Sequence, residues 1–127
     1  MDLRDAYFVD GCRTWFGKSR PDGIYWTTRA DDMVTKVMVE LQKRNPTVPW
    51  GEVDDCIWGA TTQAGDQGTT MGRTVVFTAG LPESVAGFSV DRMCAGGMTC
   101  QAIGSSFIRS GCADIIIAGG VEHMAHH

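Results

Sequence analysis

Short apolar runs alternate with stretches of helical periodicity along this chain. The apolar runs end at polar or glycine-bearing corners and predict four strands, at residues 6–9, 53–60, 86–90 and 114–120. Apolar positions that recur at helical spacing predict three helices between them, at residues 31–44, 70–80 and 94–110. The predicted order is therefore β-α-β-α-β-α-β.

This alternation predicts an α/β fold with a mainly parallel sheet, because parallel strands need crossover connections. The last predicted strand is apolar throughout, which is typical of a strand that is covered on both faces. The third helix is apolar around most of its circumference, which is typical of a helix that is buried on all sides, but the sheet of this chain can cover only one of them. We therefore expect residues 1–127 alone to leave an apolar patch of the helix exposed. In such folds ligands bind beyond the carboxyl ends of the strands, and a polar corner follows residue 90 at one of these ends.

Size, charge and cysteine content narrow the class of protein. With 127 residues the chain is one domain or part of one, and it can bury a core. A net charge of −4 without basic clusters argues against a nucleic-acid surface, and no apolar run is long enough to cross a bilayer. The charged start lacks the apolar core of a signal peptide, and the five cysteines are an odd number. We therefore expect free thiols, a cytoplasmic location and no membrane contact.

Cys94 is the candidate nucleophile. It follows the third predicted strand and a polar corner, Asp91-Arg92, at the start of the third helix. The first N–H groups of a helix have no partner within it, and together with the helix dipole they stabilise a thiolate. Residues 95–97, Ala-Gly-Gly, add little bulk, so the carbonyl of a ligand could approach the main chain closely. This combination suits a cysteine that accepts an acyl group.

A structural role for Cys94 is the alternative, because free cysteines are among the most buried residue types. We interpret the other four cysteines as structural residues only, since they lack the C-x-x-C spacing and the paired histidines of a zinc site. They are Cys12, Cys56, Cys100 and Cys112. No metal site is therefore predicted.

We interpret two loops as structural and assign neither of them to a binding site. The loop at residues 65–68 bears glycines but lacks the lysine and the spacing of a phosphate-binding loop. The loop that carries Tyr25 and Trp26 is interpreted as a surface loop anchored by its aromatic residues. The first predicted strand is not followed by G-x-G-x-x-G, which argues against a dinucleotide-binding domain.

Four stretches make the chain resemble the amino-terminal part of the thiolases, which are acyl-CoA acyltransferases. They are residues 13–18 (R-T-W-F-G-K, similar to the family's R-T-P-F-G-K), 79–82 (A-G-L-P), 91–97 (D-R-M-C-A-G-G, similar to N-R-x-C-x-S-G) and 119–124 (G-G-V-E-H-M, matching G-G-x-E-x-M). The resemblance covers nearly the whole chain, and its last two motifs are the most specific. It implies that Cys94 is the nucleophile.

The resemblance implies a ping-pong acyl transfer in which the Cys94 thiolate attacks a thioester and holds the acyl group covalently. A second acyl-CoA or free coenzyme A then takes that group, in Claisen condensation or in thiolysis of a 3-ketoacyl-CoA. It implies coenzyme A thioesters as substrates, no bound cofactor, and a homodimer or dimer of dimers paired through residues 86–93. Residues 1–127 would be the first part of a thiolase, without its loop domain and carboxyl-terminal half. That half would hold the activating histidine, so this chain alone is expected to be inactive.

The chain also departs from the family pattern. Asp91 stands where asparagine is common and Gly96 where serine is common, so a preference for one acyl chain is not transferred. His123, His126 and His127 match none of the family's histidine motifs, and we interpret them as ordinary residues without a catalytic role. The alternative function is a non-catalytic thiolase-like module that binds lipid or acyl-CoA and needs no reactive thiol.

Overall fold

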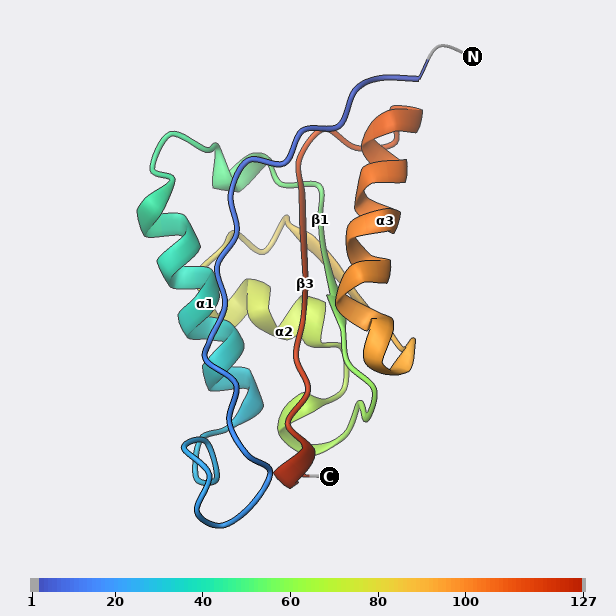
Figure 1. Ribbon diagram of the computed structural model, residues 1–127. Helices are drawn as coiled ribbons and strands as arrows, with labels where there is room; N and C mark the ends of the chain where they lie inside the picture. Colours follow the sequence, from blue (N-terminus) through green and yellow to red (C-terminus); the bar gives the residue numbers. More distant parts are fainter. Residues whose placement is uncertain (1–2, 127) are drawn as a thin grey trace.

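The computed structural model describes residues 3–126, which form three α-helices, three strands and four short 3₁₀ turns (Figure 1). In chain order the helices and strands are α1 (Ala30–Arg44), β1 (Asp55–Gly59), α2 (Met71–Thr78), β2 (Ala86–Val90), α3 (Gly96–Ser110) and β3 (Ile116–Gly120). None of these helices is long and apolar enough to span a membrane.

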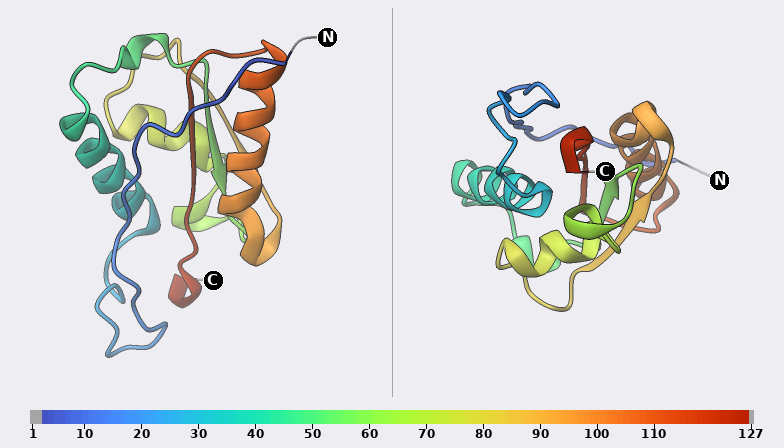
Figure 2. Two further views of the ribbon diagram at one scale, coloured as in Figure 1. Left: turned by 45° about the horizontal axis from the view of Figure 1, so that its top comes forward. Right: turned by 90° about the horizontal axis from the view of Figure 1, so that it is seen from below.

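The three strands form one parallel sheet in the order β2-β1-β3. Asp55 at the start of β1 is level with Ala86 on one side and with Ile116 on the other. The carboxyl ends of the strands therefore share one edge of the sheet. α1 and α2 lie on one side of the sheet and α3 lies on the other, as the view from below in Figure 2 shows. The predicted α/β class with a parallel sheet is confirmed.

The core lies between the sheet and the layer of α1 and α2. Cys56 and Trp58 of β1 are buried toward these helices, whereas Ile57 between them is buried near α3. The helices contribute Val34, Met38, Met71, Val75 and Val76. Full burial of one such aliphatic side chain contributes about 1.5–3 kcal/mol, so this layer supplies much of the stability of the fold.

Most helices and strands begin and end close to the positions that the sequence predicts. α1 has acidic residues in its first turn and basic residues in its last turn, which complements the helix dipole. α3 ends at Ser110, and the Gly111 that follows has a φ of 77°, the left-handed conformation that terminates many helices. The strand predicted at residues 86–90 coincides with β2, and the predicted strands at 53–60 and 114–120 contain β1 and β3.

The first predicted strand is wrong. Residues 6–9 form no strand, and Figure 1 shows the start of the described chain as an irregular segment that crosses near the start of β3 and then descends between α1 and β3. Between Arg4 and Arg20 the described chain makes no backbone-to-backbone hydrogen bond. Phe8 is 82% exposed, and its neighbours on either side are exposed too. A cavity of about 990 Å³ is lined by this segment, by α1 and by β3. An apolar run becomes a strand only when another strand pairs with it, and no strand of the described chain pairs with residues 6–9.

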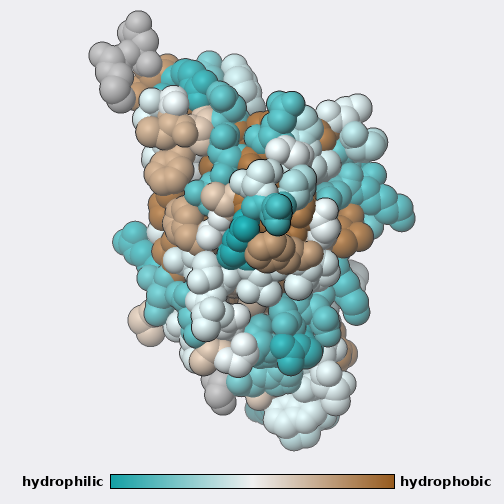
Figure 3. All heavy atoms as spheres, turned by 180° about the vertical axis from the view of Figure 1, so that it is seen from behind, coloured by the Kyte–Doolittle hydropathy of each residue, from teal (hydrophilic) through white to brown (hydrophobic). Residues whose placement is uncertain are grey.

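α3 is buried on one side only, as expected for a helix that the sheet of this chain can cover on one side. Gly96, Cys100 and Gly104 are buried, whereas Met98 is 71% exposed. Seen from behind, apolar residues gather along the edge of the molecule that α3 forms (Figure 3). Within residues 3–126 the sheet covers one face of the helix, and the apolar residues of its other face remain exposed.

The variant Gly59→Ala tests the close backbone contact between the sheet and α3. A Cβ atom at Gly59 would lie 2.5 Å from the carbonyl carbon of Gly96, so the first turn of α3 would have to move away from β1. We expect the free energy of unfolding to fall by about 1–3 kcal/mol, measured by urea unfolding. Gly51→Ala is the control, because a Cβ atom there would lie 3.7 Å from Pro82, an ordinary contact. Equal stability of the two variants would contradict this account of the contact.

Candidate functional site

Cys94 lies at the carboxyl edge of the sheet, on the 3₁₀ turn Met93–Ala95 that connects β2 to α3. Its side chain is exposed. α3 begins at Gly96, so the partly positive amino-terminal end of that helix lies directly after the turn. The structure thus places Cys94 at the strand-to-helix corner that the sequence predicted, while its catalytic role stays a prediction.

The turn that carries Cys94 has an unusual backbone. Met93 has a φ of 47°, in the left-handed region that residues other than glycine seldom adopt. Asp91 supports this conformation, because its Oδ1 accepts a hydrogen bond from the Met93 N–H at 3.1 Å. The Ala95 N–H donates to the Arg92 carbonyl at 3.1 Å and closes the turn. The chain therefore passes abruptly from β2 into α3 and leaves Cys94 at the surface.

Glycines allow α3 to begin directly against the strand ends. Gly96 is buried against Gly59 of β1, and a Cβ atom at Gly120 of β3 would lie 3.2 Å from the Gly97 Cα. The sequence interpretation gave Gly96 and Gly97 the role of leaving room for a ligand. The structure shows that Gly96 also leaves room for the backbone of β1, since a Cβ atom there would lie 3.2 Å from the Gly59 Cα, whereas the nearest atoms to a Cβ atom at Gly97 would lie at 4.0 Å, an ordinary contact.

A polar network connects the loops that leave β1 and β3 at this same edge. Glu122, just after β3, accepts hydrogen bonds from the Thr61 N–H at 3.1 Å and from Gln67 Nε2 at 3.2 Å. Gln67 is 1% exposed, and its Oε1 accepts a hydrogen bond from the His123 N–H. The glutamate of the G-G-x-E-x-M stretch therefore fixes the two loops to each other.

The rings of His123 and His126 stack, with centroids 3.7 Å apart and planes inclined by 16°. His123 is buried, and its Nε2 lies 2.9 Å from the Tyr25 carbonyl oxygen. In His126, Nδ1 lies 2.7 Å from Asp66 Oδ2 and Nε2 lies 2.8 Å from the Trp26 carbonyl oxygen. The loop that carries Tyr25 and Trp26 is therefore anchored through the backbone carbonyls of these two residues, and not through their aromatic rings alone.

The other four cysteines differ from Cys94 in burial or in position. Burial raises the pKa of the Cys56 thiol to about 12, and burial also raises the pKa of Cys12 and of Cys100. Cys112 is exposed, but it follows the carboxyl end of α3, where the helix dipole disfavours an anion. Cys94 is therefore the exposed thiol at the favourable end of this helix.

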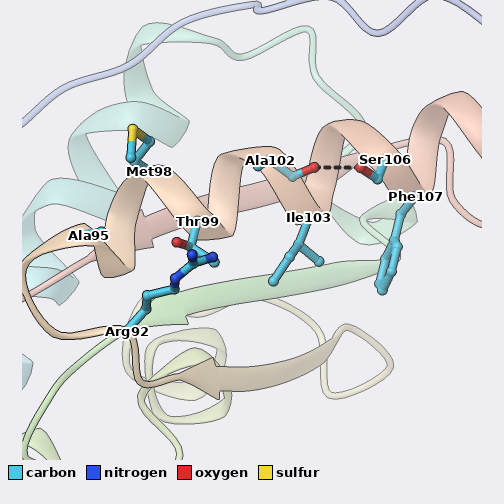
Figure 4. Close-up of a pocket in the computed structure, with 8 residues that line it drawn as sticks. All are labelled: Arg92, Ala95, Met98, Thr99, Ala102, Ile103, Ser106 and Phe107. Carbon is cyan, nitrogen blue, oxygen red and sulfur yellow. Dashed lines mark hydrogen bonds between the residues drawn. The ribbon is translucent and has the colours of Figure 1, made fainter.

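An open groove of about 510 Å³ runs along α3 and reaches the turn that carries Cys94. Figure 4 shows Ile103 and Phe107 pointing from α3 toward the strands, while Met98 points away from them. Arg92 extends toward Thr99 at the end of the groove nearest the turn (Figure 4). The groove thus combines apolar walls with one cationic side chain close to the nucleophile candidate.

The contacts of Gln67, His123 and His126 had no recognisable signal in the sequence. Gln67 and Glu122 are 55 positions apart, and a single glutamine or histidine belongs to no local pattern. His127 lies outside the described residues. Within residues 3–126 no three His, Cys, Asp or Glu side chains come together as a metal site.

Comparison with known proteins agrees with this arrangement. The family model described as "Thiolase, N-terminal domain" matches residues 6–127. A 3-ketoacyl-CoA thiolase of Saccharophagus degradans is 37% identical over 126 residues, which are 99% of this chain and 32% of that protein. A beta-ketoadipyl-CoA thiolase of Acinetobacter baylyi is 41% identical over 123 residues, which are 97% of this chain and 30% of that protein.

A solved structure gives the same result for the fold. The crystal structure of the Bacillus anthracis acetyl-CoA acetyltransferase matches with a TM-score of 0.70 and 30% sequence identity, over 77% of this chain and 24% of that one. The chain spans about a third of the length of the curated relatives that it matches. The match of the family model to nearly every residue shows that the chain belongs to the thiolase family.

Proposed function

We propose that the complete protein containing this chain is a thiolase-type acyl-CoA acyltransferase with Cys94 as its nucleophile. One observation carries the proposal: in a chain of this family, Cys94 is exposed on a tight turn at the start of α3. That position combines access for a substrate with the end of a helix that favours an anion.

In the direction of Claisen condensation, the proposed first step moves an acyl group from coenzyme A to Cys94. The thiolate of Cys94 attacks the carbonyl carbon of an acyl-CoA, and the bond between that carbon and the coenzyme A sulfur breaks. The departing sulfur takes up the proton that the Cys94 thiol lost, through a base that we expect outside this chain. The oxyanion that forms in between would accept a hydrogen bond from the Cys94 N–H.

The second step consumes the acyl-enzyme. In condensation, an acyl-CoA deprotonated at its α carbon attacks the acyl group on Cys94 and forms a 3-ketoacyl-CoA, and the α proton returns to the Cys94 thiolate. In thiolysis the steps run the other way: the Cys94 thiolate attacks the C3 carbonyl carbon of a 3-ketoacyl-CoA, the bond between C2 and C3 breaks, and the departing acetyl-CoA takes up the proton of the Cys94 thiol at its α carbon. Free coenzyme A then takes the acyl group from Cys94 as a new acyl-CoA, and its thiol proton returns to Cys94. The relatives support coenzyme A thioesters as the substrate class, since they include 3-ketoacyl-CoA thiolases and an acetyl-CoA acetyltransferase. The proposed chemistry uses no bound cofactor or metal.

The alternative function is a non-catalytic module of the same fold that binds lipid or acyl-CoA. Its fold would need the same glycines and the same parallel sheet, so the fold alone does not separate the two functions. The reactivity of Cys94 does separate them, because a binding module needs no activated thiol.

The proposed location is the cytoplasm. All five cysteines of the chain are free thiols in the structure. Thiols persist in a reducing compartment, which supports that location.

Cys94 should be alkylated faster than every other cysteine of this chain. Cys112 is the matched comparison, because both thiols are exposed and flank the same helix at opposite ends. The anionic form that reacts with iodoacetamide is favoured at the amino-terminal end and disfavoured at the other. We expect Cys94 to react at least several-fold faster, measured by peptide mapping after brief treatment of the complete protein at neutral pH.

Two outcomes of this mapping contradict the proposal. Faster labelling of Cys112 would show that exposure, and not position on α3, determines reactivity. Faster labelling of Cys12, Cys56 or Cys100 would show that burial does not suppress these thiols.

We expect the complete protein to pair as a homodimer through β2. This strand lies at the edge of the sheet, and the groove along α3 is lined by Arg92 just beyond its end. A contact that uses the same surface on both copies is the commonest way for identical chains to pair. Light scattering should give a dimer or a dimer of dimers, with slow hydrogen exchange at residues 86–93. A monomer, or a dimer with fast exchange there, would contradict this pairing.

Residues 1–127 alone should associate in solution and should not catalyse acyl transfer. Large apolar side chains are exposed on the segment before α1 and on α3. They include Tyr7, Phe8, Val9, Trp15, Phe16 and Met98. A patch of this kind drives association unless further protein covers it. Size-exclusion chromatography and an assay of acetoacetyl-CoA thiolysis check both parts, and a monomeric fragment with turnover would overturn them.

A further inference from the structure

The loop at residues 19–29 lies at the carboxyl edge of the sheet, beside the end of the described chain (Figure 1). Hydrogen bonds within the loop join Gly23 to Arg20 and Trp26 to Gly23. Two histidine rings connect it to the segment after β3, His123 through the Tyr25 carbonyl and His126 through the Trp26 carbonyl. The loop contains no helix or strand that could hold it in place. The hydrogen bonds of the two histidine rings therefore help to fix its position.

The partners of His126 define its protonation state. The Trp26 carbonyl oxygen can only accept a hydrogen bond, so Nε2, at 2.8 Å, must carry a proton. Asp66 Oδ2 accepts a hydrogen bond from the Ala30 N–H at 2.9 Å, and His126 Nδ1 lies 2.7 Å from the same oxygen. Nδ1 must therefore donate as well. A ring that donates from both nitrogens is an imidazolium cation.

The charges around His126 agree with this assignment. The hydrogen bond to the Trp26 carbonyl, followed by that to Asp66, raises the pKa of His126 above its ordinary value, although loss of hydration and the nearby Arg29 oppose the shift. Arg29 itself is paired with Asp31 at 2.7 Å, and the other titratable group in contact is the stacked ring of His123. Burial raises the pKa of Asp66, but its hydrogen bonds from His126 and Ala30 outweigh burial and lower it overall. Asp66 is thus ionised where His126 is protonated.

We propose that His126 is a proton-operated latch, which holds the loop at residues 19–29 to Asp66 when its ring is protonated and releases the loop when it is not. The neutral ring has one N–H, so it can satisfy either the carboxylate or the Trp26 carbonyl but not both. The nitrogen without a proton then faces an oxygen lone pair at hydrogen-bond distance, which is repulsive. The latch does not depend on the proposed function of Cys94.

The direction of the pH dependence follows from linkage. A histidine whose pKa is raised in the latched state stabilises that state fully below its unlatched pKa, near 6.5. The stabilisation is lost as the pH rises through the raised, latched pKa. The equilibrium constant for opening should increase about tenfold for each unit by which latching raises the pKa.

Hydrogen exchange of the complete protein, followed by mass spectrometry, tests the latch. Exchange of peptides that cover residues 19–29 is measured from about pH 6 to about pH 9 and corrected for the intrinsic pH dependence of amide exchange. In the parent protein the corrected protection should fall as the pH rises through the pKa of His126. Protection that stays constant over this range would overturn the proposal.

Three variants make the test specific. His126→Phe keeps a ring to stack on His123 but removes both donors, so the loop should be weakly protected at every pH. Asp66→Asn keeps an acceptor of the same shape and removes the charge, so the midpoint should shift to lower pH. Asp22→Asn is the control, because Asp22 is an exposed carboxylate of the same loop, and its midpoint should equal that of the parent. An unchanged midpoint in Asp66→Asn, or a pH dependence that persists in His126→Phe, would refute the latch.

Discussion

The contact between the backbone of the strand ends and the first turn of α3 is the constraint on which the rest of this structure depends. Gly59 and Gly96 leave no space for a side chain between β1 and the helix, and Gly120 of β3 also lies close to it, since a Cβ atom there would lie 3.2 Å from the Gly97 Cα. Because α3 begins so close to the sheet, the connection from β2 must turn within a few residues. That turn includes Met93 in a left-handed conformation and exposes Cys94 at its end. The packing of the fold and the position of the candidate nucleophile therefore have one physical cause.

The fold could be predicted from the sequence wherever the determining interactions are local. α1 carries its own end signals, and β2 is an apolar run bounded by polar corners, so both were found within a residue or two. Residues 6–9 have the same apolar character as a strand, but a strand also needs a partner, and periodicity contains no information about partners. The one-sided burial of α3, by contrast, could be predicted, because a single sheet covers only one side of a helix that is apolar nearly all round.

The candidate site, like the fold, has a part that could be predicted from the sequence and a part that could not. The place of Cys94 followed from a strand, a polar corner and a helix start that are adjacent in the sequence. Asp91, noted as a departure from the common asparagine, keeps the oxygen acceptor that the Met93 turn uses, so this difference preserves the local geometry. The network of Glu122, Gln67 and His123 depends on distant residues and could not be predicted, although the stretch that contains Glu122 had been recognised by its resemblance.

The central claim is that Cys94 accepts an acyl group, and trapping the acyl-enzyme tests it most directly. The complete protein is mixed with acetoacetyl-CoA, quenched in acid and analysed by peptide mass spectrometry beside the variant Cys94→Ala. The account predicts one acetyl group on the peptide that contains Cys94, and none on the matching peptide of the variant. An acetyl group on another cysteine, or none on a correctly folded parent protein that turns over the substrate, would contradict it.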